Sequence, residues 1–312
     1  MAFTIDIQPH FDFKNIRITN NDTKEYIDIV SKGGLLNSWV QPNGSTPFDV
    51  IDGNDLSKGW LNFESNGFKS AKMNPFCCRL NCGKYEIDTS SYKIEKFYLQ
   101  KHAIHGLLYD VEFEIDNTEL NDQCAIVYLS YQYQKKDAGY PFDYQIKLKW
   151  SFWDDHKIIV ETEITNNENV NIPMADGWHP YFKLADNIDD CTLQFINKGL
   201  LEYDTELIPT NKLIPNHEFE NGLKLKEINL DNGYLLDNSN PTCILENTKY
   251  KVVITPDHNY PYLQIYTPPN RNSIAIENLS GAPDCFNNKM GLHIMQPHEI
   301  WTLKTQYQFF YK

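Results

Sequence analysis

The feature that most constrains the fold of this chain is a run in which apolar and polar side chains alternate residue by residue. The apolar set is Tyr144, Ile146, Leu148, Trp150 and Phe152, and the polar set between them is Gln145, Lys147, Lys149 and Ser151. Successive side chains of a β-strand point to opposite faces, so this run predicts a strand with one buried and one exposed face. A second alternating run, 158–164, follows turn residues at 154–155, and the two runs predict a β-hairpin that ends at the Asn-rich stretch 166–171.

The same alternation recurs along the chain and predicts an all-β protein. It appears at 127–133, at 301–309 and in short runs around Val252 and Leu263. No long stretch keeps apolar residues at helical spacing, and Gly, Pro and Asn interrupt the sequence too often for long helices. Regular strand spacing favours a large sandwich of two antiparallel β-sheets.

The domain organisation is expected to be simple. No linker-like composition and no fixed-period repeat divides the sequence, so residues 1–312 are expected to form one β-sandwich domain. The longest irregular stretch is 42–74, and we expect it to supply a lid or a wall of a site.

Charge and composition narrow the classes of partner. The formal net charge is -14 and there are only three arginines, with no basic run, so a nucleic-acid partner is not expected. No apolar run approaches the ~20 residues of a membrane helix, and the first ten residues lack the features of a signal peptide. We therefore expect no membrane partner and a cytoplasmic location, and the odd number of cysteines, seven, favours reduced thiols over a disulfide framework.

Two histidines three positions apart, His102 and His105, are the first candidates for chemistry. Gly106 follows His105 and allows the backbone to turn or to approach a ligand closely. A zinc site is one interpretation, but no third Cys or His ligand lies nearby at an ordinary zinc spacing. Histidines hydrogen-bonded in a loop are the simpler interpretation, and we expect no metal site.

The segment 176–182 reads Asp-Gly-Trp-His-Pro-Tyr-Phe and is the densest cluster of polar and aromatic groups. Pro180 favours an extended conformation for His179, and the flanking aromatic side chains can partly desolvate its imidazole. Both effects favour a fixed proton donor, and aromatic faces beside a polar group also suit a sugar ring. The alternative is a plain corner of the core, where aromatic residues and proline also cluster.

A carboxylate and an arginine complete the candidate residues. Glu277 follows the apolar run 274–276, where an acid costs free energy unless it is paired or lies in a cleft, so it is a candidate base. The alternative for Glu277 is a carboxylate that marks the solvent end of a strand. Arg79 offers a planar fork of donors to hydroxyl or carboxylate groups, with a surface ion pair as its alternative role.

Taken in order, these segments resemble the aldose 1-epimerase (mutarotase) family, whose members share a large β-sandwich of the galactose-mutarotase type. The segments that carry the resemblance are Arg79-Leu80 with Gly83, His105-Gly106, the stretch 177–182 around His179, Leu207-Ile208-Pro209-Thr210, Asp231-Asn232-Gly233-Tyr234, Gln264-Ile265-Tyr266-Thr267, and Glu277 with Pro283-Asp284 and Asn287. Each motif alone is weak, but together in the family's order they form a specific combination. Two departures stand out: Cys78 replaces the Asn that often precedes the family's Arg, and Asn278-Leu279-Ser280 replaces its usual Thr-Gln.

The resemblance implies an isomerase that interconverts the anomers of a monosaccharide substrate, with His179 as acid, Glu277 as base and no cofactor. It also implies that four polar side chains bind the sugar, namely Arg79, His105, Asp231 and Gln264. The reaction moves one proton off the anomeric hydroxyl and another onto the ring oxygen. An ordinary imidazole pKa near ~6.5 and a glutamate pKa raised by partial burial would suit it, with a bell-shaped pH dependence.

Two other functions remain open at this point. A hexose-6-phosphate 1-epimerase of the same superfamily would need a cluster of Arg or Lys around its phosphate. A non-catalytic carbohydrate-binding protein would have no need of both His179 and Glu277. The sequence specifies neither the preferred sugar nor the oligomeric state.

Overall fold

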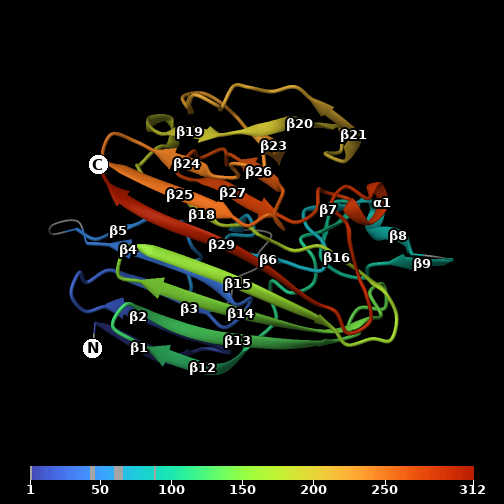
Figure 1. Cartoon of the computed structure of the whole chain (residues 1–312), viewed down its shortest axis with the longest axis horizontal. Coiled ribbons are helices and arrows are strands. Elements are labelled where there is room, and N and C mark those ends of the chain that lie inside the picture. Colours follow the sequence, from blue (N-terminus) through green and yellow to red (C-terminus); the bar gives the residue numbers. More distant parts are fainter. Residues whose placement is uncertain (1, 43–45, 60–65, 88) are drawn as a thin grey trace.

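The alternating runs pair into a β-sandwich in the computed structural model, which describes residues 2–42, 46–59, 66–87 and 89–312. One layer is a nine-stranded antiparallel sheet that runs across the molecule in Figure 1. Its strands, in spatial order, are β12 (Glu114–Leu120), β13 (Cys124–Gln134), β14 (Asp143–Trp153), β15 (Lys157–Asn166), β29 (Ile300–Tyr311), β25 (Tyr250–Pro256), β24 (Cys243–Glu246), β19 (Thr192–Phe195) and β22 (Leu223–Lys224).

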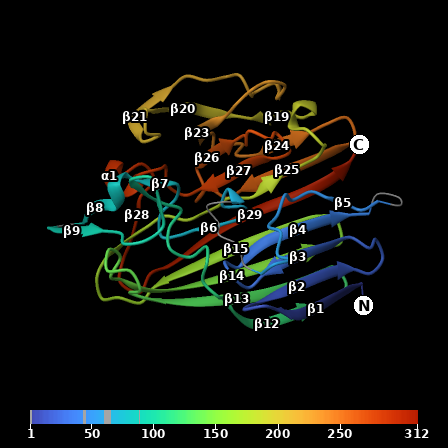
Figure 2. The same cartoon turned by 180° about the vertical axis from the view of Figure 1, so that it is seen from behind.

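The other layer consists of two sheets rather than one. The five-stranded sheet contains β1 (Phe3–His10), β2 (Phe13–Asn20), β3 (Tyr26–Val30), β4 (Leu35–Gln41) and β5 (Phe48–Asp49). The eight-stranded sheet contains β21 (Pro209–Ile214), β20 (Asn197–Tyr203), β23 (Asp231–Leu236), β26 (Tyr262–Tyr266), β27 (Ile274–Leu279), β17 (Gly177–Trp178) and β6 (Lys72–Met73), with β18 (Tyr181–Phe182) also paired to β27. In Figure 2, β2, β3 and β4 lie in front of β13, β14 and β15. In Figure 1, which views the molecule from the opposite side, they lie behind these strands. The predicted sandwich is confirmed, with its second layer divided.

Several smaller elements accompany the two layers. A three-stranded sheet contains β10 (Tyr98–Leu99), β11 (His102–Ile104) and β7 (Arg79–Leu80). The remaining elements are the pairs β16 (Ile172–Met174) with β28 (His293–Met295) and β8 (Lys84–Ile87) with β9 (Ser90–Lys93), the 3-10 turns Asn81–Gly83 and Ile188–Asp190, and the short helix α1 (Cys285–Asn288). In the part of the chain that the structure describes, no helix has the length and apolar character needed to cross a membrane.

The hairpin predicted from the alternation is formed by β14 and β15. Trp150 pairs with Val160 and Ile146 with Ile164, so the apolar set of each strand faces the same layer. The burial pattern alternates along β15 and along β14 as far as Trp150, whereas Ser151, expected on the exposed face, is buried. Strand β15 ends at Asn166, where the Asn-rich stretch begins. The alternating runs at 127–133 and 301–309 lie within β13 and β29.

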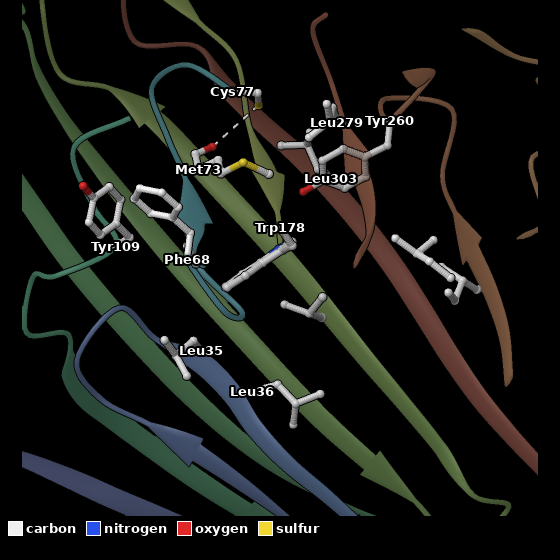
Figure 3. Packing of buried hydrophobic residues seen from close by; sticks show 14 of the residues in the cluster. Leu35, Leu36, Phe68, Met73, Cys77, Tyr109, Trp178, Tyr260, Leu279 and Leu303 are labelled. Atoms are coloured by element: carbon white, nitrogen blue, oxygen red, sulfur yellow. Dashed lines mark hydrogen bonds between the residues drawn. The ribbon is translucent and has the colours of Figure 1, made fainter. Parts of the chain in front are cut away.

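Aromatic side chains join the two layers. Trp150 of β14 meets Trp178 of β17 edge to face, with ring centroids 5.3 Å apart, and Phe182 of β18 meets Tyr307 of β29 at 5.7 Å. Figure 3 shows Trp178 among the buried apolar side chains between the strands. Packed aromatic pairs of this kind hold their strands in place, so the core fixes the residues on either side of the 179–181 segment.

A fully buried ion pair lies within this core. Lys72 of β6 and Asp176, just before β17, are both 0% exposed, and Lys72 Nζ lies 2.5 Å from Asp176 Oδ2. Asn74 Nδ2 donates to Asp176 Oδ1 at 2.9 Å, and the Tyr260 hydroxyl donates to Oδ2 at 2.6 Å. Burial lowers the pKa of Lys72, and Asp176 opposes this effect. Removing either partner would leave the other as an uncompensated buried charge.

We expect the substitution Asp176→Ala to lower the free energy of unfolding by about 3–5 kcal/mol, because Lys72 would remain buried without its counter-charge. Urea unfolding followed by tryptophan fluorescence measures the loss. Glu163→Ala is the matched control, because its ion pair with Lys147 is largely exposed, at 38% and 50%, and such pairs contribute only about 0–1 kcal/mol. Equal losses in the two variants would contradict the stabilising role of the Lys72–Asp176 pair.

A second buried carboxylate ties the hairpin turn to the five-stranded sheet. Glu25, just before β3, is 0% exposed and accepts hydrogen bonds from Trp39 Nε1 at 2.8 Å and from Gln41 Nε2. His156 lies in the turn between β14 and β15, and its Nδ1 is 2.6 Å from Glu25 Oε2. This hydrogen bond raises the pKa of His156, although partial burial acts in the opposite direction. The folded state therefore favours the charged imidazole.

The His156–Glu25 contact predicts a pH-dependent contribution to stability. Because the pKa of His156 is raised on folding, the contribution is present below an unfolded pKa of about 6.5 and is lost as the pH rises through the folded value. We expect the difference in free energy of unfolding between the wild type and His156→Gln to be larger near about pH 6 than near about pH 9. His217→Gln, at a largely exposed histidine, is the control. A difference that does not change with pH would refute the prediction.

Candidate active site

Because side chains alternate along each strand, the eight-stranded sheet has one face toward a pocket and one face toward the core. In the register of its central strands, Gln264 pairs with both Glu277 and Gly233, and Asp231 pairs with Tyr266. These side chains lie on the face that lines a pocket. The neighbouring positions, such as Ile265 and Ile276, point to the other face and are 0% exposed in the core.

His179 reaches the same pocket from the extended segment after β17. Its backbone N–H donates to the Ala71 carbonyl at 3.1 Å, and its carbonyl accepts from the Ser70 N–H at 2.9 Å. The imidazole stacks on Tyr181, with ring centroids 5.1 Å apart, and meets His105 edge to face at 5.0 Å. The predicted extended conformation and the contact with a flanking aromatic ring are therefore present. Trp178 faces the core instead, as alternation along the segment requires.

Arg79 belongs to the three-stranded sheet, and His105 directly follows strand β11 of the same sheet. Ile104, the last residue of β11, pairs with Arg79, and the His105 N–H donates to the Cys78 carbonyl at 2.9 Å. Gly106 has a φ of +75°, and a Cβ there would lie 2.2 Å from the Asn74 carbonyl oxygen. The glycine after His105 is thus needed for close approach to another backbone segment, rather than to a ligand.

All six residues expected from the sequence line one pocket of about 280 Å³: Arg79, His105, His179, Asp231, Gln264 and Glu277. The structure thus brings together residues separated by up to two hundred positions along the chain. Further lining comes from Phe68, Tyr181 and Tyr266, whose rings supply apolar surface, and from Leu99 and Leu207. A small cavity with convergent polar groups on an aromatic surface is the usual form of a small-molecule site.

The closest contact between titratable groups in the pocket joins His179 and Glu277. Nε2 of His179 lies 3.3 Å from Oε1 of Glu277, and the two side chains are only 7% and 2% exposed. Burial lowers the pKa of His179 to about 4. Burial also raises the pKa of Glu277 well above its ordinary value, with the negative charge of Asp231 acting in the same direction. The lowered pKa of His179 and the raised pKa of Glu277 thus favour the uncharged form of both side chains.

A second polar group in the pocket is built around Asp231. Its Oδ1 accepts a hydrogen bond from Gln264 Nε2 at 2.8 Å. Burial raises the pKa of Asp231, and the positive charge of Arg79 and the bond from Gln264 counteract this rise. Arg79 itself lines the pocket.

Three expectations about these residues need correction. Glu277 does not mark the solvent end of a strand: β27 continues to Leu279, and Glu277 is 1% exposed. The imidazole of His179 does not keep an ordinary pKa, because desolvation lowers it to about 4. His102 lies in β11 and not in a loop, and outside the pocket lining its Nδ1 accepts a hydrogen bond from the Cys82 N–H at 3.2 Å.

The metal and thiol predictions can be compared with the described residues. No group of three or more His, Cys, Asp or Glu side chains in the described ranges has an arrangement suited to a metal ion. All seven cysteines lie within those ranges as free thiols, and six of them are buried. Gly67 and Phe68 of the irregular stretch 42–74 line the pocket, so this stretch supplies part of its wall, while positions 43–45 and 60–65 lie outside the described residues.

Some pocket residues were not found as site residues from the sequence. Cys78, noted only as a departure from the family pattern, has its Sγ 3.9 Å from Glu277 Oε2. Tyr181 and Tyr266 lie within the motifs of the resemblance, and their spacing of two from His179 and Gln264 could have placed them on the same faces. Tyr203 lies outside every motif, and no sequence signal indicates it.

The fold and the pocket define a β-sandwich protein with a buried histidine–glutamate contact in a pocket of about 280 Å³. The sequence profile of the aldose 1-epimerase family matches residues 14–308. The chain therefore belongs to the aldose 1-epimerase family. A search of curated proteins finds no significant match.

Solved structures show the same fold along almost the whole chain. A galactose mutarotase-like protein from Clostridium acetobutylicum superposes with a TM-score of 0.87 at 15% identity, over 100% of this chain and 99% of that one. A galactose 1-epimerase from Lactobacillus acidophilus gives a TM-score of 0.81 at 14% identity, over 99% and 98%. A GalM/aldose epimerase homologue from C. elegans gives 0.77 at 18% identity, over 96% and 99%. At these identities the likeness concerns the fold.

Proposed function

We propose that the protein is an aldose 1-epimerase that interconverts the α and β anomers of a free aldose. The observation that carries the proposal is the buried contact of 3.3 Å between His179 Nε2 and Glu277 Oε1 on the wall of the pocket. The ring oxygen and the anomeric hydroxyl of a sugar are bonded to the same carbon. Two groups this close together can therefore reach both oxygens of one anomeric centre.

In the proposed reaction, Glu277 accepts the proton of the anomeric hydroxyl while His179 donates a proton to the ring oxygen. The bond between the anomeric carbon and the ring oxygen breaks, and the open-chain aldehyde forms. Rotation about the adjacent carbon–carbon bond presents the other face of the carbonyl, and closure returns both protons with the roles of acid and base exchanged. The four remaining polar residues, Arg79, His105, Asp231 and Gln264, hold the hydroxyls of the sugar during the rotation.

The number of protons that His179 and Glu277 can hold together suits this reaction. The reaction needs one acid and one base at the same time, which means one proton shared by His179 and Glu277. A neutral histidine beside a protonated glutamate is the form that the lowered pKa of His179 and the raised pKa of Glu277 favour, and it has the same number of protons as imidazolium beside carboxylate. Transfer of that one proton between Oε1 and Nε2 converts one form into the other.

The character of the pocket favours a free aldose over a phosphorylated sugar. Arg79 is the single Lys or Arg among the described residues that line it. A phosphate dianion is normally held by several cationic groups, and Asp231 beside Arg79 would repel it.

The proposed function is tested by polarimetry of freshly dissolved α-glucose, α-galactose and other aldoses. We expect the wild type to accelerate the relaxation of optical rotation and both Glu277→Gln and His179→Asn to reduce the enzymatic rate by about 10²–10⁴-fold, because each removes one proton-transfer group. The matched controls are Glu163→Gln and His217→Asn, which make the same chemical changes at exposed sites. Binding of aldoses without acceleration would identify a carbohydrate-binding protein, and acceleration restricted to hexose 6-phosphates would identify the phosphate-specific epimerase.

The pKa directions also predict the pH dependence of kcat/KM. A second proton adds to the pair below about pH 4, where His179 becomes charged and no base remains. The last proton leaves only at a higher pH, set by the raised pKa of Glu277, and then no acid remains. We expect a bell-shaped profile with its acid limb near pH 4, measured by polarimetry after subtraction of the uncatalysed rate. An acid limb near ~6.5 would contradict the desolvated state of His179.

A further inference from the structure

A hydrogen-bonded chain of three side chains lies in the pocket beside the acid–base pair. The Tyr203 hydroxyl donates to Gln264 Oε1 at 2.9 Å, and Gln264 Nε2 donates to Asp231 Oδ1 at 2.8 Å. All three side chains line the pocket, and Gln264 pairs in register with Glu277 on the next strand. The chain therefore begins at a tyrosine outside every recognised motif and ends at a carboxylate within the proposed sugar site.

The neighbouring strands leave room for the Tyr203 hydroxyl beside Gln264. The pairing of β20 with β21 shifts register between Leu201 and Tyr203, with the extra residues on β21. On the adjacent strand, a Cβ at Gly233 would lie 2.3 Å from the Tyr203 hydroxyl oxygen and 3.0 Å from Gln264 Oε1. Any other residue at Gly233 would displace the Tyr203 hydroxyl. The glycine of the Asp231-Asn232-Gly233-Tyr234 segment therefore leaves space for the hydrogen bond between Tyr203 and Gln264.

The direction of the hydrogen bonds determines what the three residues present to a ligand. The hydroxyl of Tyr203 fixes the amide of Gln264 with its oxygen toward the tyrosine and its nitrogen toward Asp231. Asp231 then keeps its second oxygen as an acceptor, Gln264 keeps its second N–H as a donor, and the Tyr203 oxygen keeps an acceptor site. Burial raises the pKa of Tyr203 well above its ordinary value, so the tyrosine stays a hydroxyl donor.

We propose that Tyr203 is a specificity-determining residue that orients Gln264 and Asp231 to recognise one hydroxyl group of the sugar ring. The proposal rests on the proposed function, because it assigns the binding of an aldose to the same pocket. A sugar that lacks the recognised hydroxyl would leave the buried groups of this chain unpaired, which is the strongest basis for discrimination between polar ligands. Tyr203 acts through Gln264 and Asp231, and not on the transferred protons.

The test compares the wild type with Tyr203→Phe, which removes only the hydroxyl. We expect KM to rise about 3- to 10-fold with a smaller change in kcat, since one hydrogen bond that orients the binding groups is lost. Calorimetric titration of the same sugar into Glu277→Gln and into Glu277→Gln/Tyr203→Phe measures the binding change without turnover. Each singly deoxygenated analogue of the best aldose is then titrated in the same way. We expect the pocket with Tyr203 intact to bind one analogue much more weakly than the parent sugar. Tyr203→Phe is expected to reduce this difference in affinity and to leave the differences for the other analogues unchanged.

Control variants distinguish a changed orientation of Gln264 and Asp231 from a general loss of structure. Tyr234→Phe makes the same change in the same sheet, but on the core face, where Tyr234 packs against Phe195 at 4.9 Å, and no effect on discrimination is expected. Tyr203→Phe and Asp231→Asn should be non-additive in a double-mutant cycle, because both act through one chain. Equal loss of affinity for all analogues, additive effects, or unchanged binding by Tyr203→Phe would each overturn the role of Tyr203. If the wild type does not accelerate the reaction but still discriminates against one deoxygenated analogue, only the proposed catalysis is overturned. If no sugar binds, both the proposed catalysis and the role of Tyr203 are overturned.

Discussion

The buried ion pair between Lys72 and Asp176 is the interaction on which the geometry of the pocket most depends. Lys72 and Asp176 lie in the backbone segments that position His179 and His105. The segment around Lys72 exchanges two backbone hydrogen bonds with His179, at 2.9 Å and 3.1 Å, and Met73 places its Sδ 3.0 Å from Nδ1 of His105. A charge pair of this kind is costly to bury, so it persists only where hydrogen bonds from several strands satisfy it. The same bonds that satisfy Asp176 therefore fix the two imidazoles relative to each other.

Strand alternation explains how a site of polar groups exists on a sheet that also forms the core. Each central strand of the eight-stranded sheet sends every second side chain into the apolar interior and the others into the pocket. A shift of one residue in register would exchange the two sets, which would bury the pocket carboxylates among aromatic rings and expose the apolar side chains. The pairing of Gln264 with Glu277 is thus fixed by the hydrophobic face as much as by the site itself.

Local patterns in the sequence predicted the parts of the structure that depend on local rules. The hairpin of β14 and β15 follows from period-two alternation, and the family resemblance brought together six residues that the structure places in one pocket. What the sequence did not show depends on long-range geometry. The division of the second layer into two sheets, the internal position of Glu277 in β27 and the contact of Tyr203 with Gln264 all arise from pairing between distant strands. The lowered pKa of His179 likewise comes from burial by segments far away in the chain.

Burial also connects the charge of the pocket with the class of ligand that it suits. The pair of His179 and Glu277 has no net charge when neutral histidine lies beside protonated glutamate, and none when imidazolium faces carboxylate. The positive charge of Arg79 opposes that of Asp231, so the described lining has little net charge to attract or repel a ligand. A neutral polyhydroxyl compound can enter such a pocket without bringing a counter-ion, whereas an anionic sugar would add an unbalanced charge in a desolvated space. The proposed preference for an uncharged sugar therefore has the same physical basis as the shifted pKa values of His179 and Glu277, namely the burial of the groups that line the pocket.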